Sequence, residues 1–459
     1  MTVNGQVSFW QASLGPNPPR PALPGPTEAD VCVVGAGYTG LWTAWALRRA
    51  RPDLRVVVLE ADHVGFGASG RNGGWLSGLM PGNRELMAAG PAGRTGVVGL
   101  QQALHRAVDD VLGACAEEGI GADQVKGGTL AVASTPAQLR RLRAHLATER
   151  SWGVGPDDAW ELDAAEVAER VAVPGVLGGV FNRHCARVHP AKLVRGLADA
   201  VERSGVEIFE RTPVLRIGDH EAETLTGPVR ASWVVRATEG YTAGLPGVRR
   251  QLLPMNSSMV VTEPLGDERW VQIGWEGCET LGTGAHAYLY AQRTADGRIA
   301  LGGRGVAYRF GSGTDHRGAT DEATVRELRA ALAGLWPAAA GVRIAHAWCG
   351  VLGVARDWCP TVTADPHRGL AWAGGYVGDG VAASHLAGLT LADLVLGEDT
   401  ERTRLAWVGH ASRAWEPEPL RWIGARGLYA MYRAADRAEA DGRTRTSPLA
   451  VVADRIAGR

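Results

Sequence analysis

Three glycines near the start of the chain have the spacing of a phosphate-binding turn. Gly35, Gly37 and Gly40 stand in the pattern G-x-G-x-x-G, directly after an apolar run at 31–34. In such a turn the first glycine allows a tight bend, the second lets the backbone approach a pyrophosphate, and the third lets a helix pack closely on a strand. The helix that follows presents its N-terminal N–H groups to the phosphates. The pattern therefore predicts a dinucleotide site.

A glutamate follows at the position where such sites bind ribose. Glu60 ends a second apolar run, 55–60, about 20 residues after the last glycine of the motif. The two runs and the helix between them form a β-α-β pattern, in which a carboxylate at this place accepts hydrogen bonds from ribose hydroxyls. An acidic residue here disfavours a 2′-phosphate, so NADP is not expected. FAD and NAD both fit this motif.

Two further glycine-rich segments favour FAD over NAD. Residues 65–74 read GFGASGRNGG and follow the second strand, and residues 374–381 read GGYVGDGV between an apolar strand and a helix. The second segment offers another helix N-terminus, whose partial positive charge suits the electron-rich end of a flavin ring. Two such helix starts at opposite ends of the chain favour a long, largely buried cofactor.

The elements around these motifs alternate as in a doubly wound sheet. The proline-rich residues 15–26 cannot form regular ladders and predict an extended lead-in. A helix at 190–203 leads into a strand at 206–209, and a strand at 370–373 leads into a core helix at 381–396.

The middle of the chain has a different pattern. Helices are expected at 99–118, 136–150 and 321–335, with a strand near 128–133. Residues 252–310 are rich in β-forming segments joined by glycine-containing turns.

We therefore predict an α/β protein. A Rossmann-like FAD-binding domain is interleaved with a mixed or antiparallel β-sheet substrate domain, and a helical C-terminal segment follows. The expected boundaries are 28–85, 165–250 and 340–400 for the discontinuous FAD-binding domain, 86–164 and 251–339 for the substrate domain, 1–27 for the extended lead-in, and 401–459 for the C-terminal segment.

Composition argues against several other classes. The 48 basic and 49 acidic residues nearly cancel, and no basic run is interleaved with aromatics, so no nucleic-acid partner is expected. No apolar stretch approaches the roughly 18 residues of a spanning helix, and the first residues lack a signal pattern, so we expect a cytoplasmic protein. The 6 cysteines are scattered without zinc-like spacing, so we expect buried thiols and no metal site.

The motifs resemble, in order along the chain, those of the FAD-dependent amine and amino-acid oxidase family, which includes D-amino-acid oxidase, glycine oxidase and sarcosine oxidase. The resemblance is nearest to the γ-glutamylputrescine oxidase-like branch and covers about residues 28–400. It is carried by the first glycine motif with Glu60, the 65–74 loop, residues 237–241, residues 348–350 with Asp357 and Pro360, residues 374–386, and the Gly-Gly-Arg-Gly segment at 302–305.

The resemblance implies an activity and a cofactor. A neutral amine would give hydride to flavin N5, the imine would hydrolyse, and electrons would pass to oxygen or another acceptor. The residues implied to hold FAD are Gly35, Ala36, Gly37, Tyr38, Thr39, Gly40, Glu60 and Ala61 around the ADP half; Gly67, Ala68, Ser69, Arg71, Asn72, Gly73 and Gly74 along the pyrophosphate and ring; Val214, Ala237, Thr238 and Gly240 over the cofactor; and Gly350, Gly378, Asp379, Gly380 and Val381 at the pyrimidine side.

Two departures from the family pattern bear on the substrate. Leu352 stands where glycine and D-amino-acid oxidases have an arginine that binds the substrate carboxylate, and residues 381–384 lack the lysine of sarcosine oxidases. An arginine is the efficient partner for a carboxylate, so its loss favours an amine without an adjacent carboxylate. Arg304, Arg293 and Arg356 are the candidates to bind such a group from elsewhere.

Aromatic residues of the middle segment are expected to wall the substrate site. Trp75, Tyr288, Tyr290 and Trp348 could enclose a cationic or apolar amine, and with Arg304 they are the predicted catalytic residues.

Three other side chains are candidates for chemistry. His189 and His286 are candidate bases, although hydride transfer from a neutral amine needs none. Cys349 lies one residue from the place where some sarcosine oxidases attach flavin covalently, so non-covalent FAD is the expectation.

The leading hypothesis is an FAD-dependent amine oxidase or dehydrogenase with a small-molecule amine substrate. Ala300 stands where sarcosine oxidases have an oxygen-activating lysine, so a quinone or a carrier protein stays open as the acceptor. The alternatives are an amino-acid oxidase or dehydrogenase of the glycine or sarcosine type, an NAD-dependent dehydrogenase, and a non-catalytic FAD-binding subunit of a larger oxidoreductase. The sequence leaves the amine and the oligomeric state open.

Overall fold

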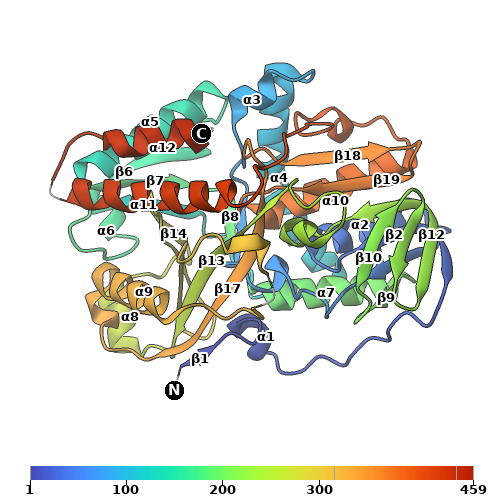
Figure 1. Cartoon of the computed structure of the whole chain (residues 1–459). Coiled ribbons are helices and arrows are strands. Elements are labelled where there is room, and N and C mark those ends of the chain that lie inside the picture. The colour runs from blue at the N-terminus through green and yellow to red at the C-terminus, as the bar shows by residue number, and fades with distance from the viewer. Residues whose placement is uncertain (1, 315, 441, 458–459) are drawn as a thin grey trace.

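The first glycine motif follows β2 (Thr27–Val34), a central strand in one of the two large sheets that Figure 1 shows. The structure, a computed structural model, describes residues 2–314, 316–440 and 442–457. An eight-stranded sheet and a nine-stranded sheet lie side by side. A separate two-stranded antiparallel ribbon pairs β4 (Trp75–Ser77) with β8 (Cys185–Arg187), which lies more than 100 residues further along the chain.

The eight-stranded sheet has a parallel centre. β12 pairs in parallel with β2 along one edge; on its other edge it pairs with β11 first and with β19 further on. β3 and β9 continue the parallel order beyond β2. The strands are β2 (Thr27–Val34), β3 (Val56–Leu59), β9 (Glu207–Phe209), β10 (Val214–Gly218), β11 (Glu221–Thr224), β12 (Gly227–Arg236), β18 (Thr361–Asp365) and β19 (Leu370–Gly374).

Side-chain alternation places the two faces of this sheet in different apolar clusters. Val31 and Val33 of β2 face a cluster shared with the helices, whereas Cys32 and Val34 face a second cluster that includes Leu23 of the lead-in. A strand buried on both faces reads as a continuous apolar run, which is why 31–34 was recognisable. The helices of the first cluster are α2 (Tyr38–Ala50), α4 (Gly93–Glu118), α7 (Pro190–Arg203) and α10 (Gly380–Leu396).

The nine-stranded sheet is mainly antiparallel. Its order is β1-β17-β13-β16-β15-β14-β5-β7-β6, and its longest pairing joins β13 to β17. The strands are β1 (Val3–Asn4), β5 (Thr129–Ala133), β6 (Ala159–Asp163), β7 (Gly178–Asn182), β13 (Leu253–Thr262), β14 (Thr280–Thr283), β15 (Tyr290–Arg293), β16 (Ile299–Gly303) and β17 (Ile344–Val354).

Short and peripheral helices complete the fold. The helices beside the nine-stranded sheet are α5 (Pro136–Ser151), α6 (Ala164–Ala168), α8 (Asp267–Ile273) and α9 (Glu322–Leu335). The remaining helical elements are α1 (Phe9–Ala12), α3 (Arg84–Ala88), α11 (Leu420–Ala440), α12 (Pro448–Ala457) and the short 3-10 turns η1 (Ala68–Gly70), η2 (Glu239–Gly244), η3 (Phe310–Ser312), η4 (Pro337–Ala339) and η5 (Arg402–Arg404).

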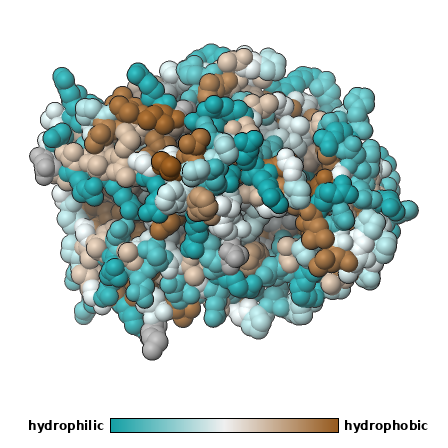
Figure 2. Space-filling model, viewed as in Figure 1, coloured by the Kyte–Doolittle hydropathy of each residue, from teal (hydrophilic) through white to brown (hydrophobic). Residues whose placement is uncertain are grey.

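The C-terminal helices lie beside each other across one end of the molecule (Figure 1). Alanines 435, 450 and 453 are fully buried where α11 meets α12. The outer side of α12 exposes apolar residues, among them Val451 and Val452, and Figure 2 shows brown residues gathered over this region.

Many predicted elements are present within a few residues of the expected bounds, and the α/β class is confirmed. The first residues differ from the expected extended lead-in. Val3 and Asn4 pair in parallel with β17, and Trp10 of α1 is 1% exposed, because its indole packs in a cluster with Trp348.

The division into two sheets also differs from the expected ranges. β7 and β17 belong to the nine-stranded sheet, although 178–182 and 344–354 were assigned to the FAD-binding part. β17 carries Gly350 and Gly353, and glycine weakens the local strand signal.

In the part of the chain that the structure describes, no helix is long and apolar enough to cross a membrane.

The close contact between α10 and α2 predicts that adding a methyl group at Gly388 destabilises the fold. A Cβ added at Gly388 would lie 2.7 Å from the Cβ of Trp42 and 2.8 Å from the backbone nitrogen of Thr43. Because both helices are part of the core, Gly388→Ala should lower the free energy of unfolding by about 1–3 kcal/mol, measured by denaturant titration. Gly113 of α4 is exposed, and a Cβ there meets nothing within 4 Å, so Gly113→Ala should be neutral or stabilising. Equal effects of the two substitutions would contradict the close packing.

Candidate functional site

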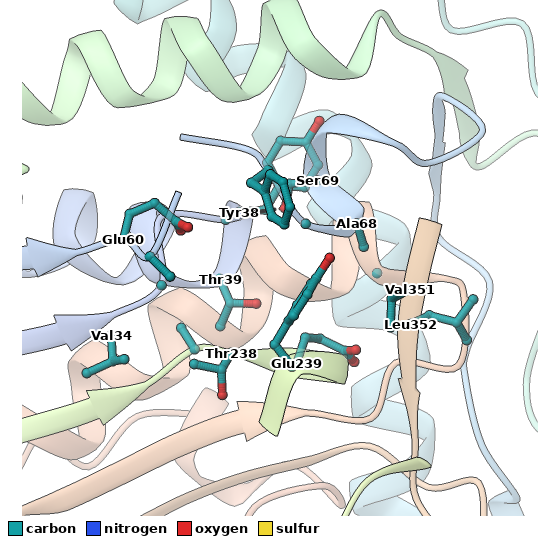
Figure 3. Close-up of a pocket in the computed structure, with 18 of the residues that line it drawn as sticks. Val34, Tyr38, Thr39, Glu60, Ala68, Ser69, Thr238, Glu239, Val351 and Leu352 are labelled. Carbon is teal, nitrogen blue, oxygen red and sulfur yellow. Dashed lines mark hydrogen bonds between the residues drawn. The ribbon is translucent and has the colours of Figure 1, made fainter. Parts of the chain in front are cut away.

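A cavity of about 630 Å³ opens where β2 ends and α2 begins. Its wall includes residues from both glycine-rich segments and from the β17 strand, and Figure 3 labels ten of the lining residues. The lining residues are Val34, Gly35, Gly37, Tyr38, Thr39, Leu59, Glu60, Ala61, Asp62, Phe66, Gly67, Ala68, Ser69, Asn72, Thr212, Val214, Ala237, Thr238, Glu239, Tyr241, Gly244, Leu245, Thr314, Arg317, Val351, Leu352, Tyr376, Gly378, Gly380, Val381 and Ser384.

The first glycine motif shapes the inner end of this cavity. Gly35 has φ +109°, a conformation that favours glycine, and a Cβ there would lie 2.6 Å from the carbonyl oxygen of Ala237. A Cβ at Gly40 would lie 2.0 Å from the Gly35 carbonyl oxygen. The strand end and the helix start can therefore approach only because both positions lack side chains.

Side-chain oxygens accept hydrogen bonds from two backbone N–H groups, one in the turn before α2 and one at its first residue. The Tyr38 backbone N–H donates to the Ser69 hydroxyl at 2.8 Å, and the Ala36 N–H donates to the Glu60 carboxylate at 2.9 Å. Both acceptors lie on the cavity wall. The helix N-terminus thus has the electrostatic character expected of a site for an anionic group.

Glu60 sits at the end of β3 and bridges two backbone groups. Its second carboxylate oxygen accepts from the Asp62 N–H at 3.0 Å. Burial raises the pKa of Glu60 to about 7, and the hydrogen bonds from Asp62 and Ala36 oppose that rise. A carboxylate poised in this way is a strong acceptor for hydroxyl groups in the cavity.

Glu239 connects three segments of the cavity wall. Its carboxylate accepts hydrogen bonds from the backbone N–H groups of Gly353 on β17, Gly375 at 2.9 Å and Tyr376 at 3.3 Å. Burial raises the pKa of Glu239, and the backbone hydrogen bonds counteract the rise. Glu239 has φ +42°. Sequence analysis missed this role, since a lone acidic residue in a loop carries no signal of its distant acceptor partners.

Most residues predicted to hold FAD line this one cavity. Those that line it are Gly35, Gly37, Tyr38, Thr39, Glu60, Ala61, Gly67, Ala68, Ser69, Asn72, Val214, Ala237, Thr238, Gly378, Gly380 and Val381. Those outside the lining are Ala36, Gly40, Arg71, Gly73, Gly74, Gly240, Gly350 and Asp379. The second set lies in the same segments, and the role of both sets toward a cofactor stays a prediction.

Two buried polar groups near this cavity have no hydrogen-bond partner among the described residues. One is the Tyr241 hydroxyl on the cavity wall, and the other comprises the Nη1 and Nη2 atoms of Arg71. Arg71 is 1% exposed, and its Nε donates to the Phe66 carbonyl oxygen at 2.6 Å. Buried polar groups are normally satisfied, so these atoms call for a ligand.

Four of the five predicted catalytic residues lie together. The ring centroids of Trp75 and Tyr290 are 6.2 Å apart, and those of Tyr288 and Tyr290 are 6.0 Å apart. The Arg304 Nη2 donates to the Tyr288 hydroxyl at 3.1 Å. Asp379 is near this group: burial raises its pKa to about 6, and the charge of Arg304 opposes the rise.

Trp348 departs from the prediction. It is 0% exposed, packs against Trp10 and Phe9, and donates its indole N–H to the Arg71 carbonyl oxygen at 2.9 Å. The side chain is therefore a core residue that holds the 65–74 loop, and it cannot face a substrate in this arrangement. An aromatic residue on a strand gives no sequence signal of which face it occupies.

The candidate bases lie outside the cavity lining. His189 caps α7, accepting from the Lys192 N–H at 3.2 Å, and burial lowers its pKa to about 4. His286 bonds to Glu439 at 2.9 Å. Both histidines have structural partners, so neither is placed to act as a base.

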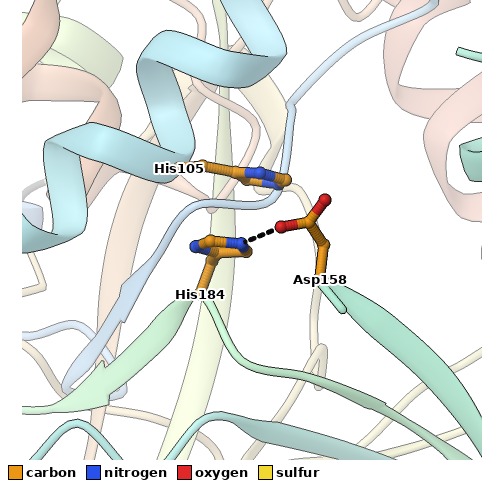
Figure 4. Close-up of side chains that lie close together, drawn as sticks. All are labelled: His105, Asp158 and His184. Atoms are coloured by element: carbon orange, nitrogen blue, oxygen red, sulfur yellow. Dashed lines mark hydrogen bonds and ion pairs between the residues drawn. The ribbon is translucent and has the colours of Figure 1, made fainter. Parts of the chain in front are cut away.

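A histidine pair away from the cavity could suggest a metal site. His105 and His184 stack with ring centroids 3.8 Å apart and an interplanar angle of 7°, and His184 Nε2 bonds to Asp158 at 2.7 Å (Figure 4). Metals bind imidazole nitrogens in the ring plane, and parallel stacked planes do not converge on one ion. The group is better described as a hydrogen-bonded stack.

Comparison with known proteins gives one consistent picture. A family model described as FAD dependent oxidoreductase (DAO) matches residues 30–394. Gamma-glutamylputrescine oxidoreductase of Escherichia coli is 30% identical over 413 residues, covering 86% of this chain and 90% of its own length. Probable oxidoreductase OrdL of Rhizobium meliloti is 29% identical over 411 residues, covering 87% of this chain and 90% of its own length.

Solved structures match the fold alone. The glycine oxidase of Geobacillus kaustophilus superposes with a TM-score of 0.69 at 21% identity and covers 84% of this chain and 100% of its own. L-proline dehydrogenase from P. horikoshii superposes with a TM-score of 0.66 at 18% identity and covers 82% of this chain and 95% of its own.

The raised pKa of Glu60 predicts a pH effect on the FAD-free protein. Below pH 4.5, the ordinary pKa of a glutamate, this carboxyl group is uncharged in both the folded and the unfolded protein and costs the fold no stability. Above about pH 7 the group is charged in both, and the full cost of burying the charge lowers the free energy of unfolding. The stability difference between wild type and Glu60→Gln should therefore fall by about 3 kcal/mol over this range and be flat above it. Denaturant titrations of both FAD-free proteins at several pH values measure this, and a constant difference would contradict the buried carboxyl.

Proposed function

Because the chain belongs to the DAO family of FAD-dependent oxidoreductases, we propose that its cavity holds FAD and that the enzyme oxidises the carbon–nitrogen bond of a small-molecule amine. The observation that carries the proposal is one continuous wall running from Glu60 past Ser69 to Leu352 and Gly378. Such a wall suits a long cofactor with its nucleoside at one end and its reactive ring at the other.

The residues present fit FAD. Glu60 and the start of α2 offer an acceptor for ribose and N–H groups for phosphate, as in other dinucleotide sites. The unpartnered Tyr241 hydroxyl and the Arg71 guanidinium can bond to polar groups of a bound ligand. We assign Gly35 to Thr39 and Ala61 to the ADP half, Gly67 to Asn72 to the pyrophosphate and ring, and Gly378 to Val381 to the ring end.

FAD supplies a ring that takes two electrons from the substrate and passes them to an acceptor. The chain's own residues orient the partners and exclude water. α10 begins at Gly380 beside the cavity, and its N-terminal partial charge stabilises negative charge there. Val351, Leu352 and Val381 supply an apolar wall at the same end.

The composition of that end supports an amine without an adjacent carboxylate. Leu352 lines the cavity and offers no charge at the place where the family resemblance expects an arginine. Trp75, Tyr288 and Tyr290 form the neighbouring aromatic group, which suits an amine in either its cationic or its neutral form. The E. coli relative is named for gamma-glutamylputrescine, which is in keeping with an amine substrate.

Anaerobic mixing of the holoenzyme with an amine panel tests the proposal. Putrescine, gamma-glutamylputrescine, pentylamine, sarcosine and glycine are added separately, and loss of flavin absorbance is followed. Amines with no carboxylate on the carbon that is oxidised should reduce the flavin at least about 10-fold faster than glycine or sarcosine, because Leu352 cannot pair with a carboxylate. Readmitting oxygen then shows whether oxygen is an acceptor.

Free FAD with each amine is the control for this experiment. If no member of the panel reduces the bound flavin, the proposed activity is wrong; if glycine or sarcosine is fastest, the amino-acid oxidase alternative replaces it.

The surroundings of Cys349 predict that the flavin is not covalently attached. Its sulfur lies 3.3 Å from His316 Nδ1 and 3.3 Å from the Ala319 carbonyl oxygen, and burial raises the pKa of the thiol to about 11. A protonated thiol is a poor nucleophile. After denaturation and filtration, the yellow colour should therefore pass into the filtrate. Colour kept by wild type but released by Cys349→Ser would contradict this.

A further inference from the structure

The C-terminal helix α11 is fixed to the segment that carries Tyr288. The Asp436 carboxylate accepts hydrogen bonds from the backbone N–H groups of His286 and Ala287, each at 2.8 Å. One turn further on, Glu439 is 1% exposed and bonds to His286 and to Arg141. Two carboxylates of α11 thus hold the residues immediately before Tyr288.

The same helix is fixed to the residue after Arg304. Arg433 donates to the carbonyl oxygen of Gly305 at 2.9 Å. Tyr429, Arg433 and Asp436 share one face of α11, because residues three and four apart lie on the same side of a helix. That face therefore covers the backbone on either side of the Tyr288–Arg304 pair.

Arg304 is a buried cation without an ion-pair partner among the described residues. It is 8% exposed, and its one hydrogen bond in that part of the chain goes to the Tyr288 hydroxyl. Burial lowers the pKa of the guanidinium, whereas the phenol groups of Tyr288, Tyr429 and Tyr290 and the nearby Asp379 carboxylate raise it, and the net shift is upward. Arginine is seldom buried unless an anion pairs with it, so the missing partner points to a ligand.

Tyr288, the hydrogen-bond partner of this arginine, lies beside the wall of the cavity. A Cβ built on Gly378, which lines the cavity, would lie 4.0 Å from the Tyr288 hydroxyl. Leu352 lines the same end and packs, as Tyr429 of α11 does, against the apolar cluster around Met255 and Tyr308. Leu352 and Tyr429, a phenol that acts on the charge of Arg304, thus pack against the same apolar cluster.

We propose that Arg304, enclosed by Tyr288 and helix α11, binds a carboxylate of the amine substrate that lies several bonds away from the oxidised carbon. The inference rests on the proposed function and narrows its substrate class to amines with a remote carboxylate. The guanidinium provides two parallel donors for such a group, and Tyr288 fixes its orientation. α11 positions the pair through Asp436 and Arg433.

The test compares two amines of equal length that differ in one end. 5-Aminopentanoate carries a carboxylate where pentylamine carries a methyl group. The apparent Kd of each comes from the concentration dependence of anaerobic flavin reduction. In wild type, 5-aminopentanoate should bind at least about 10-fold more tightly. In Arg304→Leu the two Kd values should agree within about 3-fold, with that of pentylamine unchanged.

Three further variants separate this role from folding. Arg304→Lys keeps the positive charge but loses the paired N–H donors of the guanidinium, so its preference for 5-aminopentanoate over pentylamine should lie between those of wild type and Arg304→Leu. Asp436→Ala should weaken 5-aminopentanoate binding several-fold and leave pentylamine unchanged, since it frees the segment before Tyr288. Arg437→Leu removes a charge from the exposed side of α11 and should keep the wild-type preference. The flavin absorption spectrum of each variant reports whether the cofactor site is intact.

Specific outcomes overturn the inference. The inference is wrong if wild type does not bind 5-aminopentanoate more tightly than pentylamine, or if that preference survives Arg304→Leu. It is also wrong if both amines fail to reduce the flavin while others in the panel succeed. Because the amine panel is read independently, failure of every amine overturns the proposed function instead.

Discussion

The cavity depends on one steric constraint, the near contact between the end of β2 and the start of α2. No side chain fits at Gly40, because its first carbon would meet the Gly35 carbonyl oxygen at 2.0 Å. This approach aims the N-terminus of α2 at the cavity and brings Ser69 and Glu60 within hydrogen-bond distance of its N–H groups. The polar end of the site follows from backbone geometry more than from any charged side chain.

The other end depends on buried side chains that reach across the chain. The Glu239 carboxylate accepts hydrogen bonds from backbone N–H groups of β17 and of the segment after β19. The Trp348 indole N–H donates to the Arg71 carbonyl oxygen. These contacts fix the 65–74 loop and β17 against one another. Among the described residues, the Arg71 guanidinium tip and the Tyr241 hydroxyl are left without partners, which suits the proposed cofactor, whereas Arg304 bonds to Tyr288, which suits the proposed substrate carboxylate.

Sequence alone could predict the parts whose signal is local. The glycine spacing, Glu60 and the apolar runs of β2 and α10 each express their role within a few residues, and most of the predicted FAD residues line one cavity. β17 was missed because Gly350 and Gly353 weaken a strand pattern, and Trp348 was misplaced because alternation does not say which face is core. Glu239 and α11 act through partners more than 100 residues away, which no local pattern encodes.

The pairing of Val3 and Asn4 with His346 and Ala347 has a consequence for biosynthesis. A nascent chain leaves the ribosome from its N-terminus, so this strand lacks its partner until more than three quarters of these 459 residues have been translated. The sheet, and with it the wall that β17 gives the cavity, is completed only late in synthesis.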